Sequence, residues 1–317
     1  MKVSLLAGLI IGVAVAMLVL YTAPPIEDFN PLNPYWNGFS DLMSKFHAVE
    51  LKSLLDENLF LDPSNTSLLI VGPEKEFSED EAKIIKRFLK SGGQVILADD
   101  FGSGNQLLEL LEVDVRFNGS LLVDPLFKER SMRLPRIRAM VLGVRELVFN
   151  YGTVLEGCPS PIAESSSYSF LDLDLNGEWS EGEPRGSFAA ACSLSLGKGR
   201  LIIVADSSLW VNSMLQMRDN RKFLESLTGG RAVLIDESHW KPSSLTIAKR
   251  MLNISFSYIT SPELRYALIA LIIVALVRYR RRHRRAEEDE GEKVLMRNPT
   301  WDKGLLIKLE REMRGER

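Results

Sequence analysis

The chain has 317 residues, of which 45% are hydrophobic and 26% are charged, so it can fold one globular domain of ordinary size and still supply further segments. Residues 22–262 hold 24 Lys and Arg against 32 Asp and Glu, a net charge of −8. This mildly acidic balance argues against nucleic acid as a partner. Residues 263–317 hold 14 basic against 10 acidic residues, and this excess follows an apolar stretch, as is typical of membrane proteins.

The N-terminal segment is apolar. Residues 3–20 are 18 consecutive positions without a charged side chain, which is just long enough for a helix to cross a bilayer. We therefore predict that residues 1–21 form an N-terminal transmembrane helix. A cleaved signal peptide is the alternative because Lys2 precedes the apolar stretch, but no small-x-small site precedes a plausible cleavage position, and Pro24 and Pro25 follow at once.

A second apolar stretch, residues 264–277, is followed by six arginines between Arg278 and Arg285. A buried core helix is the alternative, but such arginines are typical of the cytoplasmic flank of a transmembrane helix. We predict that residues 263–279 cross the membrane, and that both termini of this two-pass cell-membrane protein are cytoplasmic. Residues 22–262 then form an extracytoplasmic domain and residues 280–317 a basic cytoplasmic tail. In that tail, residues 301–314 have the pattern of an amphipathic helix.

The outer domain begins with an α/β pattern. Buried strands at 67–71 and 94–98 enclose a helix that starts at the capping box Ser78 to Glu81 and stops at Gly92 and Gly93. Short connections of this kind require a right-handed parallel crossover. Other strands are expected at 48–54, 201–205 and 232–235, and helices at 38–46, 104–111, 209–227 and 242–252. Over about residues 114–196 the apolar residues no longer recur at helical spacing. The pattern there predicts strands at 147–155 and 187–196, and therefore a hairpin-like, β-rich insertion.

Polar side chains follow the buried strands directly. The carboxyl ends of parallel strands form the edge at which open α/β sheets bind ligands. We therefore predict an acidic rim on this edge, which caps helices, binds a ligand or meets a partner. Its members are Asp99, Asp206, Asp236 and Glu237.

Several stretches of the chain resemble one family. They are Ser78-Glu-Asp-Glu81, Lys90-Ser-Gly-Gly-Gln-Val-Ile-Leu-Ala-Asp-Asp100, the stretch from Gly197 to Asn212, Asp219-Asn220 and Asp236-Glu-Ser-His239. Over roughly residues 29–239 they look like the archaeal and bacterial membrane proteins of domain of unknown function family 4350. That resemblance implies a class I glutamine amidotransferase-like domain, which is flavodoxin-like α/β: a mostly parallel sheet with helices on both faces. It also implies a membrane complex, because members are often encoded near MoxR-type ATPases and von Willebrand A-domain proteins.

The catalytic cysteine of that fold is missing at its expected place. Amidotransferase chemistry needs a cysteine at a sharp strand-to-helix turn beside a histidine. Asp99 and Asp100 occupy the turn after strand 94–98, whereas Cys158 lies in a proline-rich loop and Cys192 in an expected strand. We therefore expect a non-catalytic binding or assembly component. The two cysteines either form a disulfide, which an extracytoplasmic location allows, or remain unpaired thiols.

An extracytoplasmic hydrolase is the alternative function. Ser207 or Ser208 follows one buried strand, and Asp236 and His239 follow another, so a Ser-His-Asp grouping at one sheet edge is conceivable. The sequence lacks the Gly-x-Ser-x-Gly elbow that exposes a nucleophilic serine. Serine and aspartate after a strand are also ordinary helix caps, which favours the non-catalytic interpretation.

The sharpest local motif lies in the insertion, at residues 172–183. It matches the Asp-x-Asp-x-Asn-Gly calcium loop with a glutamate at the twelfth position, in which side-chain oxygens and one backbone carbonyl surround the ion. The flanking residues read as coil and strand, unlike the paired helices of an EF-hand. An acidic solvated turn is the alternative. The predicted calcium ligands are Asp172, Asp174, Asn176, Glu178, Ser180 and Glu183.

Overall fold

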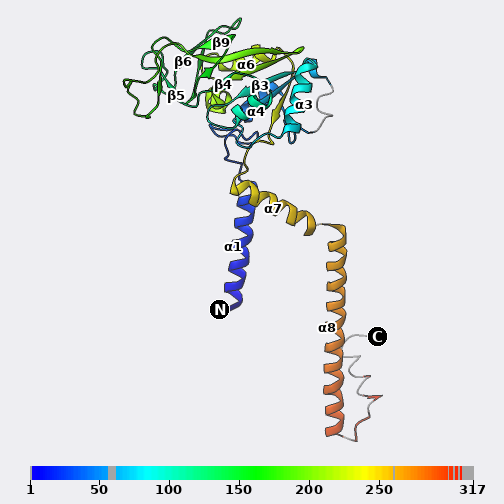
Figure 1. The fold of residues 1–317 in the computed structure, drawn as a ribbon. Helices are drawn as coiled ribbons and strands as arrows, with labels where there is room; N and C mark the ends of the chain where they lie inside the picture. The colour runs from blue at the N-terminus through cyan, green and yellow to red at the C-terminus, as the bar shows by residue number, and fades with distance from the viewer. Residues whose placement is uncertain are drawn as a thin grey trace. The chain divides into compact units, whose positions relative to one another are not determined.

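The computed structural model describes residues 2–55, 62–259, 261–298, 300–302, 304–305 and 308. The chain divides into two compact units, Met1–Ile247 and Ala248–Arg317. The first unit contains helix α1 (Lys2–Thr22) and a mixed α/β domain, and it ends within helix α7 (Ser244–Ile259). Helix α8 (Pro262–Arg297) lies in the second unit (Figure 1).

The centre of the domain is a parallel sheet. Its strands lie in the order β1 (Val49–Leu51), β13 (Ala232–Asp236), β2 (Thr66–Val71), β3 (Gln94–Ala98) and β12 (Gly199–Val204). Every residue of β2 and β3 is buried, so both faces of the sheet are covered there, as in other parallel sheets. The predicted parallel core is confirmed. Its strand order differs from the 2-1-3-4-5 order of flavodoxins, because the last strand, β13, lies between the first two.

Helix α3 (Glu79–Lys90) forms the predicted crossover between β2 and β3. Its N-terminus is fixed by the predicted capping box, in which the Ser78 hydroxyl accepts from the Glu81 backbone N–H and the Glu81 carboxylate accepts from the Ser78 backbone N–H. Its buried side chains are apolar and share one face, which packs against β3 and β12. They are Ala82, Ile85, Phe88 and Leu89.

The insertion extends this sheet with antiparallel strands. Strand β11 (Ala189–Leu196) pairs with β12 on one side and with β9 (Pro161–Glu164) on the other, and β6 (Arg136–Ala139) and β7 (Glu146–Val148) continue the sheet. Figure 1 shows β6 and β9 on the side of the domain away from α3. The short strands β4 (Arg116–Phe117) and β8 (Leu155–Glu156) pair with each other, and β5 (Leu121–Val123) pairs with β10 (Phe170–Asp172).

The insertion is β-rich, as predicted, but its strands pair differently from the predicted hairpin. Residues 147–155 do not form one strand: β7 ends at Val148, and Tyr151 has a φ of 57°, which interrupts the extended conformation. Strand β7 is also separated from β11 by β6 and β9. Between these two regions only Leu155, in β8, pairs with β11, antiparallel to Ala189, so the predicted hairpin is reduced to this single pair.

The helices occur in two groups. Helix α4 (Gly104–Leu110) contacts α3, whereas α2 (Ser40–Phe46) contacts α5 (Asn212–Leu215), which in turn contacts α6 (Asn220–Thr228). The single helix predicted over 209–227 is wrong, because the chain there forms the 3-10 helix η3 (Ser207–Trp210), α5 and α6. A further 3-10 helix, η2 (Pro63–Asn65), precedes β2.

The candidate membrane helices lie at both ends of the chain. Within the described residues, no single helix combines the length and the apolarity needed to cross a membrane, whereas Ser244–Tyr258 and Pro262–Arg282 satisfy this test together and are bent by 59°. Residues Ile11–Thr22 of α1 form a shorter apolar helix. The two predicted spans, 1–21 and 263–279, stay predictions. Most of the predicted tail helix, 301–314, lies outside the described residues.

Candidate functional site

The acidic loop after β10 is closed by its own carboxylates. The Asp172 Oδ2 atom accepts a hydrogen bond of 3.0 Å from the Gly177 backbone N–H. Glu183 closes the other end, since its two carboxylate oxygens accept from the backbone N–H groups of Leu173 and Ser180, at 2.8 and 2.9 Å. Gly177 has a φ of 80°, a conformation that favours glycine at this turn.

Three carboxylates converge inside this loop. Asp172, Asp174 and Glu183 each place one oxygen within 4.8 Å of the other two. Asp172 and Glu183 are only 1% and 8% exposed. The Asp172 Oδ1 atom is buried and has no hydrogen-bond partner among the described residues. Because a buried carboxylate oxygen without a donor is strongly unfavourable, the group could hold a metal ion that satisfies it.

The other predicted ligands lie in the same loop. Asn176 donates from Nδ2 to the Asp174 carboxylate at 2.8 Å, and its Oδ1 atom accepts from the Glu178 backbone N–H at 2.6 Å. Its Nδ2 atom also lies 3.5 Å from the Ser180 hydroxyl. The loop follows β10, and a bridge between Phe170 and Arg185 closes its base, so the paired helices of an EF-hand are absent from these described flanks.

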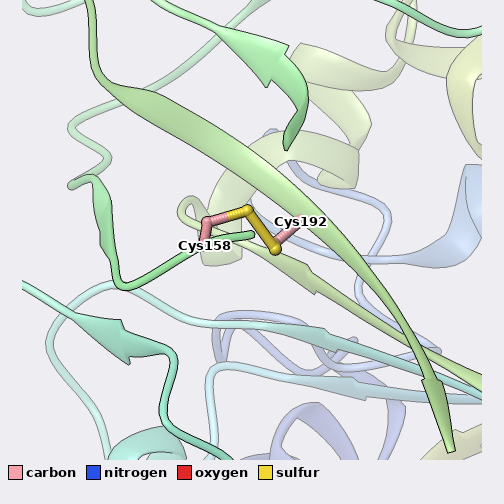
Figure 2. Close-up of a disulfide and its surroundings, with 2 residues drawn as sticks. All are labelled: Cys158 and Cys192. Carbon is pink, nitrogen blue, oxygen red and sulfur yellow. A yellow bond between two sulfur atoms is a disulfide. The ribbon is translucent and has the colours of Figure 1, made fainter. Parts of the chain in front are cut away.

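The two cysteines form a disulfide. Cys158 lies on a loop and Cys192 on the long strand β11, with their Cα atoms 5.9 Å apart (Figure 2). Of the two possibilities that the sequence allowed, the structure shows the bonded one. Disulfides persist in oxidising compartments, so this bond suggests that the domain is extracytoplasmic.

Asp99 directly follows β3, in the turn that leads to α4. The side chain is 1% exposed, and its carboxylate accepts hydrogen bonds from the backbone N–H groups of Gly102 and Gly104, at 3.1 and 2.7 Å. Burial raises the pKa of Asp99 to about 6. Asp99 therefore organises the loop before α4, and its carboxylate is fully engaged with the backbone.

Asp206 has a similar role after β12. It is fully buried, and its carboxylate oxygens accept from the backbone N–H groups of Asn150 and Ser208, both at 2.7 Å. Burial, and then the charge of Asp100, raise the pKa of Asp206 well above its usual value. The Ser207 hydroxyl donates to the Asp100 carboxylate at 2.9 Å. These groups join the insertion to the parallel core at its carboxyl edge.

Asp236 and His239 are brought together after β13. The Asp236 Oδ2 atom lies 2.6 Å from Nδ1 of His239, and the imidazole ring stacks on Phe77 with their centroids 3.8 Å apart. The Glu81 carboxylate lies 3.7 Å from the second imidazole nitrogen. The nearest hydroxyl to this pair is that of Ser238, 3.1 Å from Nδ1, which the sequence reasoning missed.

The alternative hydrolase grouping is divided between two separated strands. Strands β12 and β13, which precede Ser207 and His239, have β3 and β2 between them. Because neighbouring strands lie about 4.8 Å apart, their ends are separated by roughly 14 Å. The structure therefore brings Asp236 and His239 together but leaves Ser207 and Ser208 with Asp100 and Asp206.

Glu237 lies toward the outer edge of the sheet. Its backbone N–H donates to the carbonyl of Leu51 on β1, and burial followed by the charge of Glu50 raises the pKa of its carboxyl. The predicted rim is thus distributed along the carboxyl edge from β12 to β13, and each of its aspartates is engaged in hydrogen bonds.

A buried asparagine links the insertion to the core and was not identified from the sequence. Asn220 is 0% exposed, and its side chain exchanges two hydrogen bonds with Val148 on β7, at 2.9 and 3.0 Å. It also donates to the carbonyls of Leu209 and Met214. The signal that could have indicated it is the Asp219-Asn220 pair that resembles the family.

Comparison with known proteins places the chain in a family. None of the curated proteins matches it. Among solved structures it is similar to the mmIFT52 N-terminal domain, with 19% sequence identity, coverage of 56% of this chain and 81% of that chain, and a TM-score of 0.41. Residues 31–228, more than half of the chain, match the family described as "Domain of unknown function (DUF4350)". The chain therefore belongs to the DUF4350 family.

Proposed function

We propose that this protein is a membrane-anchored, non-catalytic binding or assembly component whose extracytoplasmic α/β domain binds calcium in the loop 172–183. Two observations carry the calcium proposal: the Oδ1 atom of Asp172 is buried without a partner, and Asp172, Asp174 and Glu183 each place one carboxylate oxygen within 4.8 Å of the other two. A cation at this point neutralises three mutually repelling groups and supplies the missing partner.

Calcium fits the donor set better than a transition metal does. Every predicted ligand offers oxygen, and hard oxygen ligands suit calcium or magnesium. The spacing of twelve residues with a terminal glutamate favours calcium, because a glutamate at that position can supply both oxygens to a large ion. In this assignment Asp172, Asp174 and Glu183 bind through carboxylates, and the remaining ligands are Asn176, the Glu178 carbonyl and Ser180.

The non-catalytic assignment is supported by the absence of the amidotransferase nucleophile from its turn. We propose that the domain is a class I glutamine amidotransferase-like domain in which Asp99 replaces the cysteine and caps the backbone. The two cysteines of the chain are bonded to each other, so neither is a free thiol. The described contacts also leave His239 without Ser207 or Ser208 beside it, which weakens the hydrolase alternative.

The extracytoplasmic, anchored setting is supported by the disulfide and by the apolar character of the terminal helices. A two-pass topology places the domain outside and the arginines after residue 277 inside. A partner follows from this setting as a proposal: a membrane complex that includes a MoxR-type ATPase or a von Willebrand A-domain protein.

Calorimetric titration of the purified full-length protein with calcium tests this proposal. We expect saturable heat and a rise in melting temperature that a chelator reverses, since calcium at about 100 times its Kd stabilises the folded state by about 2.7 kcal/mol. Magnesium is the comparison ion and should bind more weakly. Absence of heat together with a chelator-insensitive melting temperature would overturn the calcium assignment.

The proposal that the protein is a non-catalytic binding or assembly component is tested separately. Full-length protein captured from its own membranes by cross-linking should recover the same partners when Ser207, Ser208 and His239 are replaced together by alanine. Loss of a hydrolytic turnover in that variant, with partners unchanged, would favour the alternative hydrolase.

A further inference from the structure

Helix α7 (Ser244–Ile259) has two distinct faces. Five of its polar side chains are contiguous on the helix surface, because they recur at spacings of three and four residues. They are Thr246, Lys249, Arg250, Asn253 and Ser257. The rest of the helix surface is largely apolar, and one row of it, at the spacing i, i+4, i+7 and i+11, is formed by Ile247, Met251, Ile254 and Tyr258.

The apolar face is exposed in the described part of the protein. Ile247 and Ile254 are 42% and 49% exposed, and Met251 and Tyr258 are 65% and 67% exposed. A run of four large apolar side chains on one helix face is unfavourable in water, at about 25 cal/mol per Å² of apolar surface. The face therefore requires an apolar environment that the described residues do not supply.

The polar face prevents α7 from serving as the first half of a broken transmembrane helix. Lys249 and Arg250 are adjacent and lie near the middle of the helix. A lysine or arginine at the centre of a bilayer costs about 2.5 to 3.5 kcal/mol on insertion scales. By contrast, α8 has no charged residue between Tyr266 and Val277. Of these two helices, α8 is the one that contains an uncharged apolar stretch suited to the hydrocarbon core.

Helix α7 begins in the first unit and continues in the second. Its start is held to the domain, where the hydroxyls of Ser243 and Thr246 donate to the Glu27 carboxylate. Its end is followed by Ser261 and by Pro262, the first residue of α8, and the two helices are bent by 59° at this break. If α8 enters the bilayer near Leu264, the C-terminal end of α7 cannot lie far from the headgroups.

We propose that α7 lies in the interface of the bilayer on the side of the α/β domain, with Ile247, Met251, Ile254 and Tyr258 in the upper acyl region. Lys249 and Arg250 then face the headgroups and water, where cations are attracted to anionic lipids. This inference rests on the proposed membrane anchoring through α8. It assigns α7 to the class of interfacial amphipathic helices, which seat a domain on a membrane surface without spanning it.

Single cysteines on the two faces of α7 test the proposal. The chain has two cysteines, and both are bonded to each other, so an introduced cysteine is the sole thiol of the full-length protein. The variants Ile254→Cys and Met251→Cys report on the apolar face, Asn253→Cys on the polar face and Ile272→Cys on α8. Each is labelled with an environment-sensitive fluorophore and reconstituted in vesicles that contain anionic lipid. The quenchers are iodide in water and nitroxides at shallow or deep positions of the acyl chain.

The expected result is a different quencher for each surface. Labels at 254 and 251 lose most of their fluorescence to the shallow nitroxide, the label at 253 loses it to iodide, and the label at 272 loses it to the deep nitroxide. Quenching of 254 and 251 by iodide as strongly as 253 would overturn the proposal, and so would quenching of all α7 labels by the deep nitroxide. If iodide also quenches the label at 272, the anchoring through α8 itself is wrong.

Discussion

The carboxylates of Asp172 and Glu183 meet within 4.8 Å although they stand at the two ends of a twelve-residue loop. Each one also accepts hydrogen bonds from backbone N–H groups inside the loop. The backbone thus shapes the loop, and one oxygen of Asp172 is left buried without a donor. A preformed cation site requires both features: carboxylate oxygens that hold the loop in shape, and an oxygen that remains available to the ion.

Replacing Glu183 should weaken calcium binding. Glu183→Gln removes one negative charge and one oxygen ligand from the cluster, so we expect the Kd for calcium to rise roughly tenfold or more, because affinity follows ligand charge and count. Glu181→Gln is the matched control, since Glu181 is an exposed acid of the same loop that does not belong to the cluster. Calorimetric titration of both variants measures the effect. Equal Kd values for the two variants would contradict the assignment of Glu183.

Loss of the disulfide should destabilise the domain. Cys158 and Cys192 are 34 residues apart in sequence, and closing a loop of this length stabilises a folded protein by about 3–4 kcal/mol. We expect the Cys158→Ala, Cys192→Ala double variant to melt at a lower temperature than the wild type. A reducing agent should lower the melting temperature of the wild type and leave that of the variant unchanged. An equal response of both proteins to the reducing agent would show that the bond is not formed.

The pH dependence of stability should contain a contribution from Asp99. Burial raises the pKa of Asp99 from 3.8 to about 6, so the folded protein holds this proton more tightly than the unfolded chain does. Its contribution to stability is therefore fully present below pH 3.8 and is lost as the pH rises through 6, by an amount on the order of 3 kcal/mol.

The variant Asp99→Asn isolates that contribution. Between pH 4 and 6.5 its free energy of unfolding should fall less than that of the wild type, whereas the variant of an exposed acid, Asp114→Asn, should follow the wild type. Denaturant unfolding at a series of pH values gives both curves. Parallel curves for Asp99→Asn and the wild type would show that Asp99 titrates normally.

Replacing Asn220 should loosen the join between insertion and core. In Asn220→Ala, backbone groups of Val148 and Met214 lose their partners while they stay buried, which costs about 3 kcal/mol. Arg221→Ala is the control on the same helix, because its exposed ion pair with Glu225 contributes less than about 1 kcal/mol. Denaturant unfolding compares the two variants, and similar losses would contradict the role of Asn220.

Features that depend on nearby residues could be predicted from the sequence. Both hydrogen bonds of the predicted capping box between Ser78 and Glu81 are present, because four consecutive residues determine this motif. The convergence of Asp172 and Glu183 was predictable for the same reason, since one short loop with a glycine at the turn contains all of the groups involved.

Features that depend on the tertiary arrangement could not be predicted. Strand β13 lies between β1 and β2, so His239 is separated from Ser207 although both follow buried strands. The helix expected over 209–227 is interrupted because the buried Asn220 side chain bonds carbonyls of the preceding turns. Apolar periodicity reports which residues are buried, but it contains no information on which strands become neighbours.

Labelling of intact cells tests the central claim, the extracytoplasmic position of the anchored domain, most directly. Glu76→Cys places a thiol on the exposed surface of the domain, and Met296→Cys places one at a position that is 79% exposed near the end of α8. With a thiol reagent that cannot cross membranes, we predict that Glu76→Cys is labelled in intact cells and that Met296→Cys is labelled only after permeabilisation. Labelling of Met296→Cys but not of Glu76→Cys in intact cells would contradict the proposed orientation.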